Sequence, residues 1–89
     1  MSELLRVLVA DDHPALRGGV RSVLQEAGYD VCAEAGNARD AVERAIATRP
    51  DVCLIDIGMP GNGLRALGEI VAALPGTRVL MLTVSDTSD

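Results

Sequence analysis

The sequence has 89 residues, nearly half of them apolar, and carries a formal net charge of −5. This length supports one domain with a small core, and the apolar content excludes a disordered chain. All eight basic residues are arginine, and the acids outnumber them. A basic face for direct nucleic-acid binding is therefore not expected on this chain.

The apolar runs are short, of the length of single strands. They exclude a membrane span, and no charged segment precedes one of them as in a signal peptide. Cys32 and Cys53 each lie inside an apolar run and do not form a C-x-x-C motif. We therefore expect a cytoplasmic protein without membrane contact, with both cysteines as free thiols in a reducing compartment.

The first predicted strand, Leu4 to Ala10, is followed at once by Asp11 and Asp12. Pro14 suits the first turn of a helix, because its missing N–H has no partner there in any case. Apolar residues then recur at helical spacing as far as Gly28, which is typical of a helix end. The predicted buried face of this helix comprises Leu16, Val20, Val23, Leu24 and Ala27.

A short second strand is predicted over Val31 to Ala35. Asn37 is a good N-cap for the helix that follows, and Asp40 lies three positions later, as in a capping box. Pro50 ends this helix, since the residue before a proline is disfavoured in helical conformation. The predicted buried stripe comprises Ala38, Ala41, Val42, Ala45 and Ile46.

The third strand begins at Val52 as an unbroken apolar run, which favours a strand covered on both faces, and it ends in Asp56. The turn residues Gly58, Pro60, Gly61 and Gly63 follow. A third helical stripe and a fourth strand come next. They comprise Leu64, Leu67, Ile70, Val71 and Leu74 in the helix, then Val79 to Leu82 in the strand, which ends in Thr83.

Strands and helices alternate throughout, with short connections. This order favours an α/β fold with a doubly wound parallel sheet. For a strand order of 2-1-3-4, the first strand separates Cys32 from Cys53 by about 9 to 10 Å. A disulfide is then excluded, because bridged Cα atoms lie within about 7 Å.

Three carboxylates are predicted to meet at one edge of this sheet. If the first and third strands are neighbours about 4.8 Å apart, Asp11, Asp12 and Asp56 cluster at their carboxyl ends. Such a cluster either keeps a proton or recruits a cation. Oxygen ligands at an open edge favour Mg²⁺, which leaves room for a phosphate, and the Thr83 hydroxyl could donate to a phosphoryl oxygen.

These motifs in this order resemble the receiver domain of bacterial two-component response regulators. The resemblance covers residues 1–89 and implies a flavodoxin-like sheet. It makes Asp56 the phosphoacceptor for a histidine kinase and also a Mg²⁺ ligand, Thr83 the switch hydroxyl, Asp12 a direct Mg²⁺ ligand and Asp11 a ligand through water. The Gly58 carbonyl would be a backbone ligand. D-D-H-P-A-L-R with M-P-G-N-G-L is most similar to members whose output is a C-terminal helix-turn-helix that binds DNA.

Two features depart from the family pattern. The turn M-P-G-N-G-L is one residue shorter than usual, and the pattern ends before the family's fourth helix, fifth strand and fifth helix. The lysine and the aromatic switch residue of the fifth strand are absent with them. We therefore expect this form to be truncated, to hold the acceptor without the whole switch, and to dimerise through its fourth strand and the residues from Val84 to Asp89.

Other interpretations stay open at this point. An aspartate-nucleophile phosphatase also has an acid at a strand end, but it needs D-x-D where this chain has adjacent acids. A dinucleotide-binding module lacks support, because the first turn has no G-x-G-x-x-G. A phosphorylation-independent interaction domain is a third class. We interpret His13 as a helix-entry residue and Met59 and Met81 as core residues.

Overall fold

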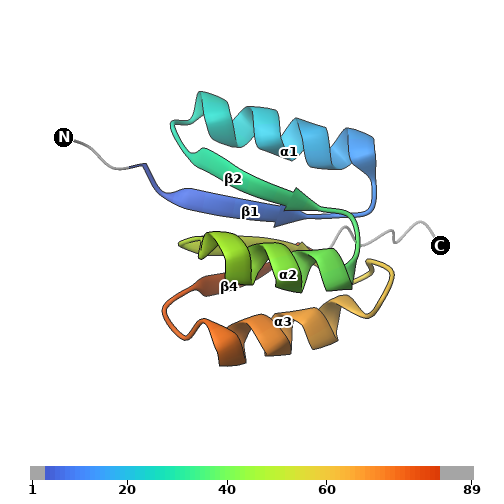
Figure 1. The fold of residues 1–89 in the computed structure, drawn as a ribbon. Helices are drawn as coiled ribbons and strands as arrows, with labels where there is room; N and C mark the ends of the chain where they lie inside the picture. Colours follow the sequence, from blue (N-terminus) through green and yellow to red (C-terminus); the bar gives the residue numbers. More distant parts are fainter. Residues whose placement is uncertain (1–3, 83–89) are drawn as a thin grey trace.

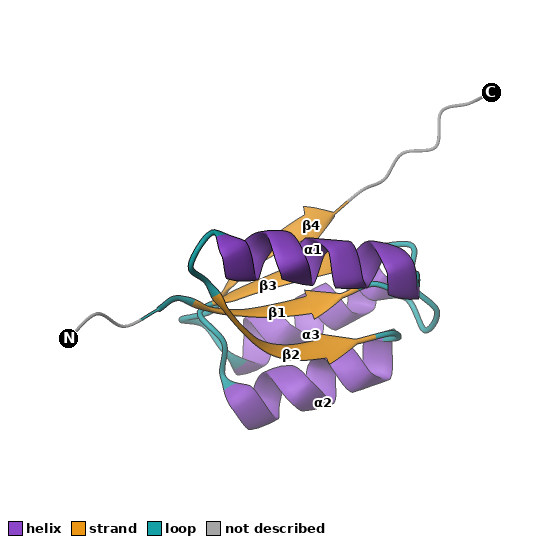
Figure 2. Cartoon of the chain, turned by 90° about the horizontal axis from the view of Figure 1, so that it is seen from above, coloured by secondary structure: helices purple, strands orange, loops and turns teal. Residues whose placement is uncertain are grey.

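A computed structural model describes residues 4–82, in which strands and helices alternate. The elements are β1 (Arg6–Ala10), α1 (Pro14–Glu26), β2 (Asp30–Ala35), α2 (Ala38–Thr48), β3 (Val52–Asp56), α3 (Gly63–Ala73) and β4 (Arg78–Leu82). The strands form one parallel sheet in the order β2-β1-β3-β4. Helix α1 lies on one face, while α2 and α3 lie on the other (Figures 1 and 2). The predicted fold class and strand order are confirmed.

The core lies between the sheet and the pair α2 and α3. Leu8 from β1, Ile55 from β3 and Ile70 from α3 are fully buried there. The helices contribute small residues as well, because Ala41 and Ala45 let α2 approach the sheet closely. Met59 belongs to this core, as predicted.

The other face of the sheet is thinly covered, which corrects two expectations. None of the residues of α1 is buried, although its apolar stripe was predicted to be. Leu54 on β3 is only half-buried, so this strand is not fully covered on both faces. Met81 is also exposed rather than part of the core, but it lies on the opposite face, in register with Ile55, on the edge strand β4. The exposure of α1 and of Leu54 has one cause: within residues 4–82, α1 alone covers their face of the sheet, and it packs against β1 and β2.

The buried stripe of α2 is narrower than predicted, with Ala38, Ala41 and Ala45 buried as expected, and that of α3 is shifted. Ile46 of α2 and both Leu64 and Val71 of α3 are exposed. On α3 the buried residues are Gly63, Ala66 and Ile70, so small residues face the sheet and the adjoining helix. The apolar pattern overstated the buried width of each helix, because α2 and α3 meet only the sheet and each other.

The helix ends follow local sequence rules. The Asn37 side chain accepts a hydrogen bond of 2.8 Å from the Asp40 N–H, which confirms the predicted N-cap of α2. Helix α3 begins in a similar way, because Asn62 accepts from the Arg65 N–H at 3.1 Å. Asn62 has a φ of 76°, a conformation that asparagine tolerates better than most residues. This second cap was not predicted.

The strand order keeps the two cysteines apart, with β1 between β2 and β3. Both are free, as predicted. Burial raises the pKa of the Cys53 thiol to about 11, so it is an inert apolar residue of the core. Cys32 is only partly buried, and its thiol lies 3.6 Å from the Val7 carbonyl oxygen.

The helices contain 11 to 13 residues each, a length of about 16 to 20 Å. The hydrocarbon layer of a bilayer is about 30 Å thick. In the described part of the chain, no helix combines the length and apolar character needed to cross it.

Candidate functional site

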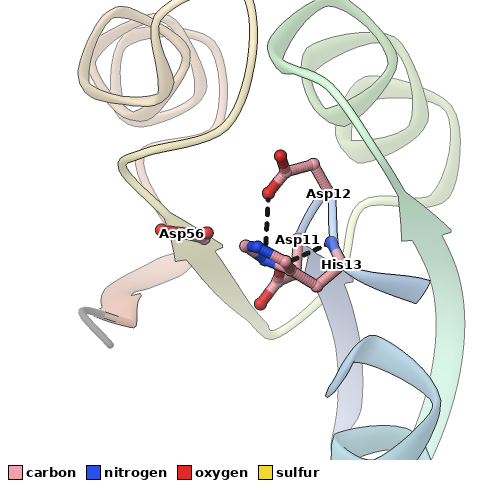
Figure 3. Close-up of side chains that lie close together, drawn as sticks. All are labelled: Asp11, Asp12, His13 and Asp56. Atoms are coloured by element: carbon pink, nitrogen blue, oxygen red, sulfur yellow. Dashed lines mark hydrogen bonds and ion pairs between the residues drawn. The ribbon is translucent and has the colours of Figure 1, made fainter. Parts of the chain in front are cut away.

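Three acidic side chains meet at the carboxyl edge of the sheet. Asp11 and Asp12 directly follow β1, and Asp56 is the last residue of the neighbouring strand β3. Figure 3 shows them together with His13 at the entry to α1. One ligand atom from each of these four residues lies within 4.8 Å of all the others. The predicted convergence of the three acids is therefore present in the structure.

Asp11 is the buried member of this cluster, with 1% of its surface exposed. Its N–H donates to the Ala35 carbonyl of β2 at 2.9 Å, and its Oδ1 accepts from the His13 N–H at 2.9 Å. Its Oδ2 is buried with no hydrogen-bond partner among the described residues. A buried carboxylate oxygen without a partner is costly, so this atom fits a cation or a cation-bound water.

Asp12 and His13 form the exposed side of the cluster. The His13 Nδ1 lies 3.0 Å from Asp11 Oδ1 and 3.2 Å from Asp12 Oδ1. The hydrogen bond to Asp11 and then the charge of Asp12 raise the pKa of His13 above its usual value of 6.5. His13 is also the N-cap residue of α1, which agrees with its interpretation as a helix-entry residue. Its place within the cluster was not predicted.

Asp56 is partly buried at the end of β3, where the chain turns away from the sheet. Its Oδ1 accepts from the Gly58 N–H at 2.9 Å, which holds the carboxylate at the open edge. Gly58 lies in the loop directly after Asp56, as expected for a residue whose carbonyl is a candidate ligand. Thr83, the candidate switch hydroxyl, lies outside the described residues.

The loop after β3 folds back over the strand end, and this requires a glycine. A Cβ atom at Gly63 would lie 2.6 Å from the Asp56 carbonyl oxygen and 2.7 Å from the Ile57 Cα. Real Cβ atoms do not approach backbone this closely, so any side chain here would displace Asp56 or α3. The glycine-rich turn noted in the sequence thus has a direct steric role beside the candidate acceptor.

The donor set of this site fits Mg²⁺. The three carboxylates come from two strand ends and offer oxygen atoms at an edge that solvent can reach. Mg²⁺ prefers such ligands and usually keeps several waters of its own. The Oδ2 of Asp11 supplies an acceptor that no other residue of the described range 4–82 uses.

Arg17 is a residue of this region that sequence reasoning missed. From the first turn of α1, its Nη1 donates to the Asp11 carbonyl oxygen at 2.9 Å. Its Nε donates to Glu34 of β2 at 3.2 Å. No sequence signal links these residues, because the contact depends on how α1 folds back along β1 and β2.

Comparison with known proteins gives one consistent family. The family model of the response regulator receiver domain matches residues 7–89. An uncharacterized transcriptional regulatory protein, YxjL of Bacillus subtilis, is 40% identical over 96% of this chain and 40% of its own length. The chemotaxis protein CheY of Thermotoga maritima is 38% identical over 85% of this chain and 64% of its own length.

A solved structure agrees with these relatives. The crystal structure of a LuxR-family two-component response regulator from Aurantimonas superposes with a TM-score of 0.86 and 32% identity. The match covers 94% of this chain and 61% of the other. This chain thus spans less than two thirds of the length of each of these three proteins. The fold, the acidic edge and the family match together show that this chain belongs to the response regulator receiver domain family of two-component signalling.

Proposed function

We propose that this chain is a phosphoacceptor module, and that Asp56 receives a phosphoryl group from a histidine kinase. The observation that carries the proposal is the meeting of Asp11, Asp12 and Asp56 within 4.8 Å at the carboxyl edge of the sheet. One of these acids, Asp11, has a buried oxygen with no partner within residues 4–82, which supports a cation beside the acceptor. The family match supports the same class of chemistry.

The transfer itself needs one carboxylate oxygen of Asp56 as nucleophile. This oxygen attacks the phosphorus of the kinase's phosphohistidine, the P–N bond breaks, and the imidazole leaves with the bonding electron pair. The product is an acyl phosphate on Asp56. The Gly58 N–H, 2.9 Å from Oδ1, orients the carboxylate for this attack.

Asp12 as a direct ligand, Asp11 through a water and the Gly58 carbonyl would hold Mg²⁺ beside Asp56. When bound, the ion screens the repulsion between the carboxylates and the incoming phosphoryl oxygens. Asp11 and Asp12 share their edge position with His13, whose Nδ1 lies within 3.2 Å of both. The imidazole therefore occupies space beside the proposed cation, and it would turn outward as the ion binds.

Thr83 is proposed to respond to the acyl phosphate through its hydroxyl. It directly follows Leu82, which is paired in register with Asp56 on the neighbouring strand. A hydroxyl at this position of the chain could donate to a phosphoryl oxygen on Asp56. A Thr83→Ala substitution is expected to leave phosphorylation of Asp56 in place while it abolishes the downstream response.

Mass spectrometry tests the acceptor. The intact protein is incubated with Mg²⁺ and acetyl phosphate, and we expect one added phosphoryl mass that Asp56→Asn abolishes. Asp30→Asn is the matched control, because Asp30 is an exposed aspartate at the start of β2, at the opposite edge of the sheet. An adduct that persists in Asp56→Asn would refute the assignment. Sustained hydrolysis of a simple phosphate ester that depends on Asp56 would favour the phosphatase alternative instead.

We further propose that residues 1–89 act as the receiver domain of a transcriptional regulator with a C-terminal helix-turn-helix output. The D-D-H-P-A-L-R motif and the similarity to the LuxR-family regulator support this output class. Phosphorylated intact protein is expected to bind promoter DNA more tightly than the Asp56→Asn variant in a gel-shift assay. Identical binding by the two proteins would contradict the proposed coupling.

Self-association through β4 is the proposed mode of dimerisation. Within residues 4–82, β4 is an edge strand of the sheet, and Leu80 is 56% exposed. An apolar edge strand offers unpaired backbone groups to a second copy. Light scattering of the 89-residue chain should show a mass that rises from monomer to dimer with concentration, and Leu80→Lys should suppress the rise. A constant monomer mass would contradict this proposal.

A further inference from the structure

The loop that carries Asp11 and Asp12 is held from outside the acidic cluster by one guanidinium group. Arg17 is about three-quarters buried, and its Nη1 donates to the Asp11 carbonyl oxygen at 2.9 Å. The N–H of Asp11 donates to the Ala35 carbonyl at the same distance. Both peptide groups that flank the Asp11 Cα are therefore fixed, and they determine where its carboxylate points.

Glu34 holds this guanidinium in place. Its Oε1 lies 3.2 Å from Arg17 Nε, and its Oε2 lies 2.9 Å from Arg21 Nη1 one turn further along α1. Glu34 is paired in register with Val9, so it lies on the sheet face that α1 covers. The ion pairs thus connect α1 to β2 directly beside the loop that bears the acids.

Gly36 provides the space that Arg17 needs. A Cβ atom at Gly36 would lie 3.1 Å from Arg17 Nη1, closer than most real contacts of this kind. Gly36 directly follows β2 and does not have a positive φ, so the backbone itself would accept alanine. An alanine here would press on the guanidinium and leave its charge unchanged.

This contact matters because the side chains of α1 anchor the helix only weakly. No residue of α1 is buried, and its N-cap residue makes no side-chain capping bond. The start of α1 is also the end of the Asp11–His13 loop, so a shift of the helix would move the acids. A polar contact between α1, β1 and β2 can prevent that shift.

We propose that Arg17, held by Glu34 and given room by Gly36, is a positioning residue that orients Asp11 for the cation beside Asp56. This inference rests on the proposed function and extends it to a residue outside the acidic cluster. Arg17 acts through the Asp11 carbonyl and does not itself contact the cation or the phosphoryl group. Residues that support metal ligands in this way typically change metal affinity by about 10-fold to 100-fold when removed.

Mg²⁺ titrations monitored by the amide NMR signals of Asp11 and Asp12 test the proposal. Arg17→Gln is expected to raise the Mg²⁺ midpoint by about tenfold or more. The Mg²⁺ midpoint of Arg17→Lys should lie between those of the wild type and Arg17→Gln, because an ammonium group cannot reproduce the forked contact with the Asp11 carbonyl and Glu34. In Arg17→Gln, the Mg²⁺ concentration needed for phosphorylation of Asp56 by acetyl phosphate should rise in parallel. Saturating Mg²⁺ should restore phosphorylation to the wild-type level.

Arg21→Gln is the matched control. It removes the other guanidinium partner of the Glu34 carboxylate but no contact with Asp11, so the Mg²⁺ midpoint should stay at the wild-type value. Gly36→Ala is the second variant, and it should weaken Mg²⁺ binding even if Arg17→Gln fails to fold. Equal midpoints for wild type, Arg17→Gln and Gly36→Ala would overturn the positioning role alone. A wild-type protein that takes up neither Mg²⁺ nor a phosphoryl group would instead refute the proposed function.

Discussion

The two faces of the sheet are stabilised in different ways. On the face covered by α2 and α3, Leu8, Ile55 and Ile70 are fully buried and form a continuous apolar core. On the face covered by α1, the helix has no buried residue and is connected to the sheet through the ion pairs of Arg17 and Arg21 with Glu34. One face therefore supplies most of the apolar stabilisation, while the other sets the geometry beside the acidic edge.

This division has a consequence for function. The loop of Asp11 and Asp12 passes from β1, which belongs to the well-packed core, into α1, which is held by polar contacts. Elements with few buried apolar contacts open and shift at lower free-energy cost than core elements. The candidate site therefore lies at the boundary between a rigid part and an adjustable part of the domain.

Truncation of a core residue should have the largest effect on stability. Ile70→Ala is expected to lower the free energy of unfolding by about 2 to 5 kcal/mol, because it leaves a cavity between α3 and the sheet. Val23→Ala removes an apolar side chain from α1 that is 67% exposed, so its effect should stay within about 0.5 kcal/mol. Urea unfolding monitored by circular dichroism measures both. Equal losses would contradict the contrast between the two faces.

Two glycines of α3 sharpen the comparison within one helix. Gly63→Ala should cost about 1 to 3 kcal/mol, because the new Cβ would meet the backbone of Asp56 and Ile57. A Cβ atom at Gly68 would meet no neighbouring element within 4 Å, so Gly68→Ala should raise stability by up to about 1 kcal/mol through helix propensity. Thermal unfolding of the two variants should shift the midpoint in opposite directions. A shared direction would show that the loop after β3 can relax.

The N-cap residues of α2 and α1 should also differ in how much they contribute to the free energy of unfolding. Asn37→Ala removes the capping bond to the Asp40 N–H and should cost about 1 kcal/mol of unfolding free energy. His13 makes no side-chain capping bond at the start of α1, so His13→Ala should cost less when both are measured above the His13 pKa. A larger loss for His13→Ala would mean that its ring supports α1 through contacts other than charge.

The smallest expected effect is the titration of His13. Its pKa should lie above 6.5, because the imidazolium is stabilised by Asp11 and Asp12. Since the folded-state pKa is raised, this contribution to stability is complete below pH 6.5 and is lost as the pH rises through the higher folded-state value. NMR of the imidazole protons measures the pKa directly, and Asp12→Asn should lower it. An unchanged pKa in Asp12→Asn would place the imidazole away from that carboxylate.

Much of the fold follows from local patterns in the sequence. The alternation of apolar runs, the Asn37 cap and the stop at Pro50 predict the order of elements and most of their ends. The site follows from topology, since parallel neighbouring strands must bring Asp11 and Asp56 to one edge. These features depend on short-range chemistry or on strand order, which the sequence specifies strongly.

The remaining features depend on which surfaces meet. Ile46 and Val71 look like core residues on a helical wheel, but they lie beyond the width of helix that the sheet and the adjoining helix cover. The Arg17 contact with Asp11 arises only when α1 lies across both β1 and β2. Helical periodicity describes a residue's angle around its own helix, so it predicts neither the covered width nor a contact between separate elements.

The most direct test of the acidic edge is paramagnetic broadening by Mn²⁺, used in place of Mg²⁺. At low Mn²⁺ concentration, the amide signals of Asp11 to His13 and of Asp56 to Gly58 should broaden first, and excess Mg²⁺ should restore them. Asp12→Asn should remove the effect, while Asp30→Asn should not. Broadening spread over the acidic residues of α2 and α3, with Asp12 and Asp56 unaffected, would contradict a cation site at the ends of β1 and β3.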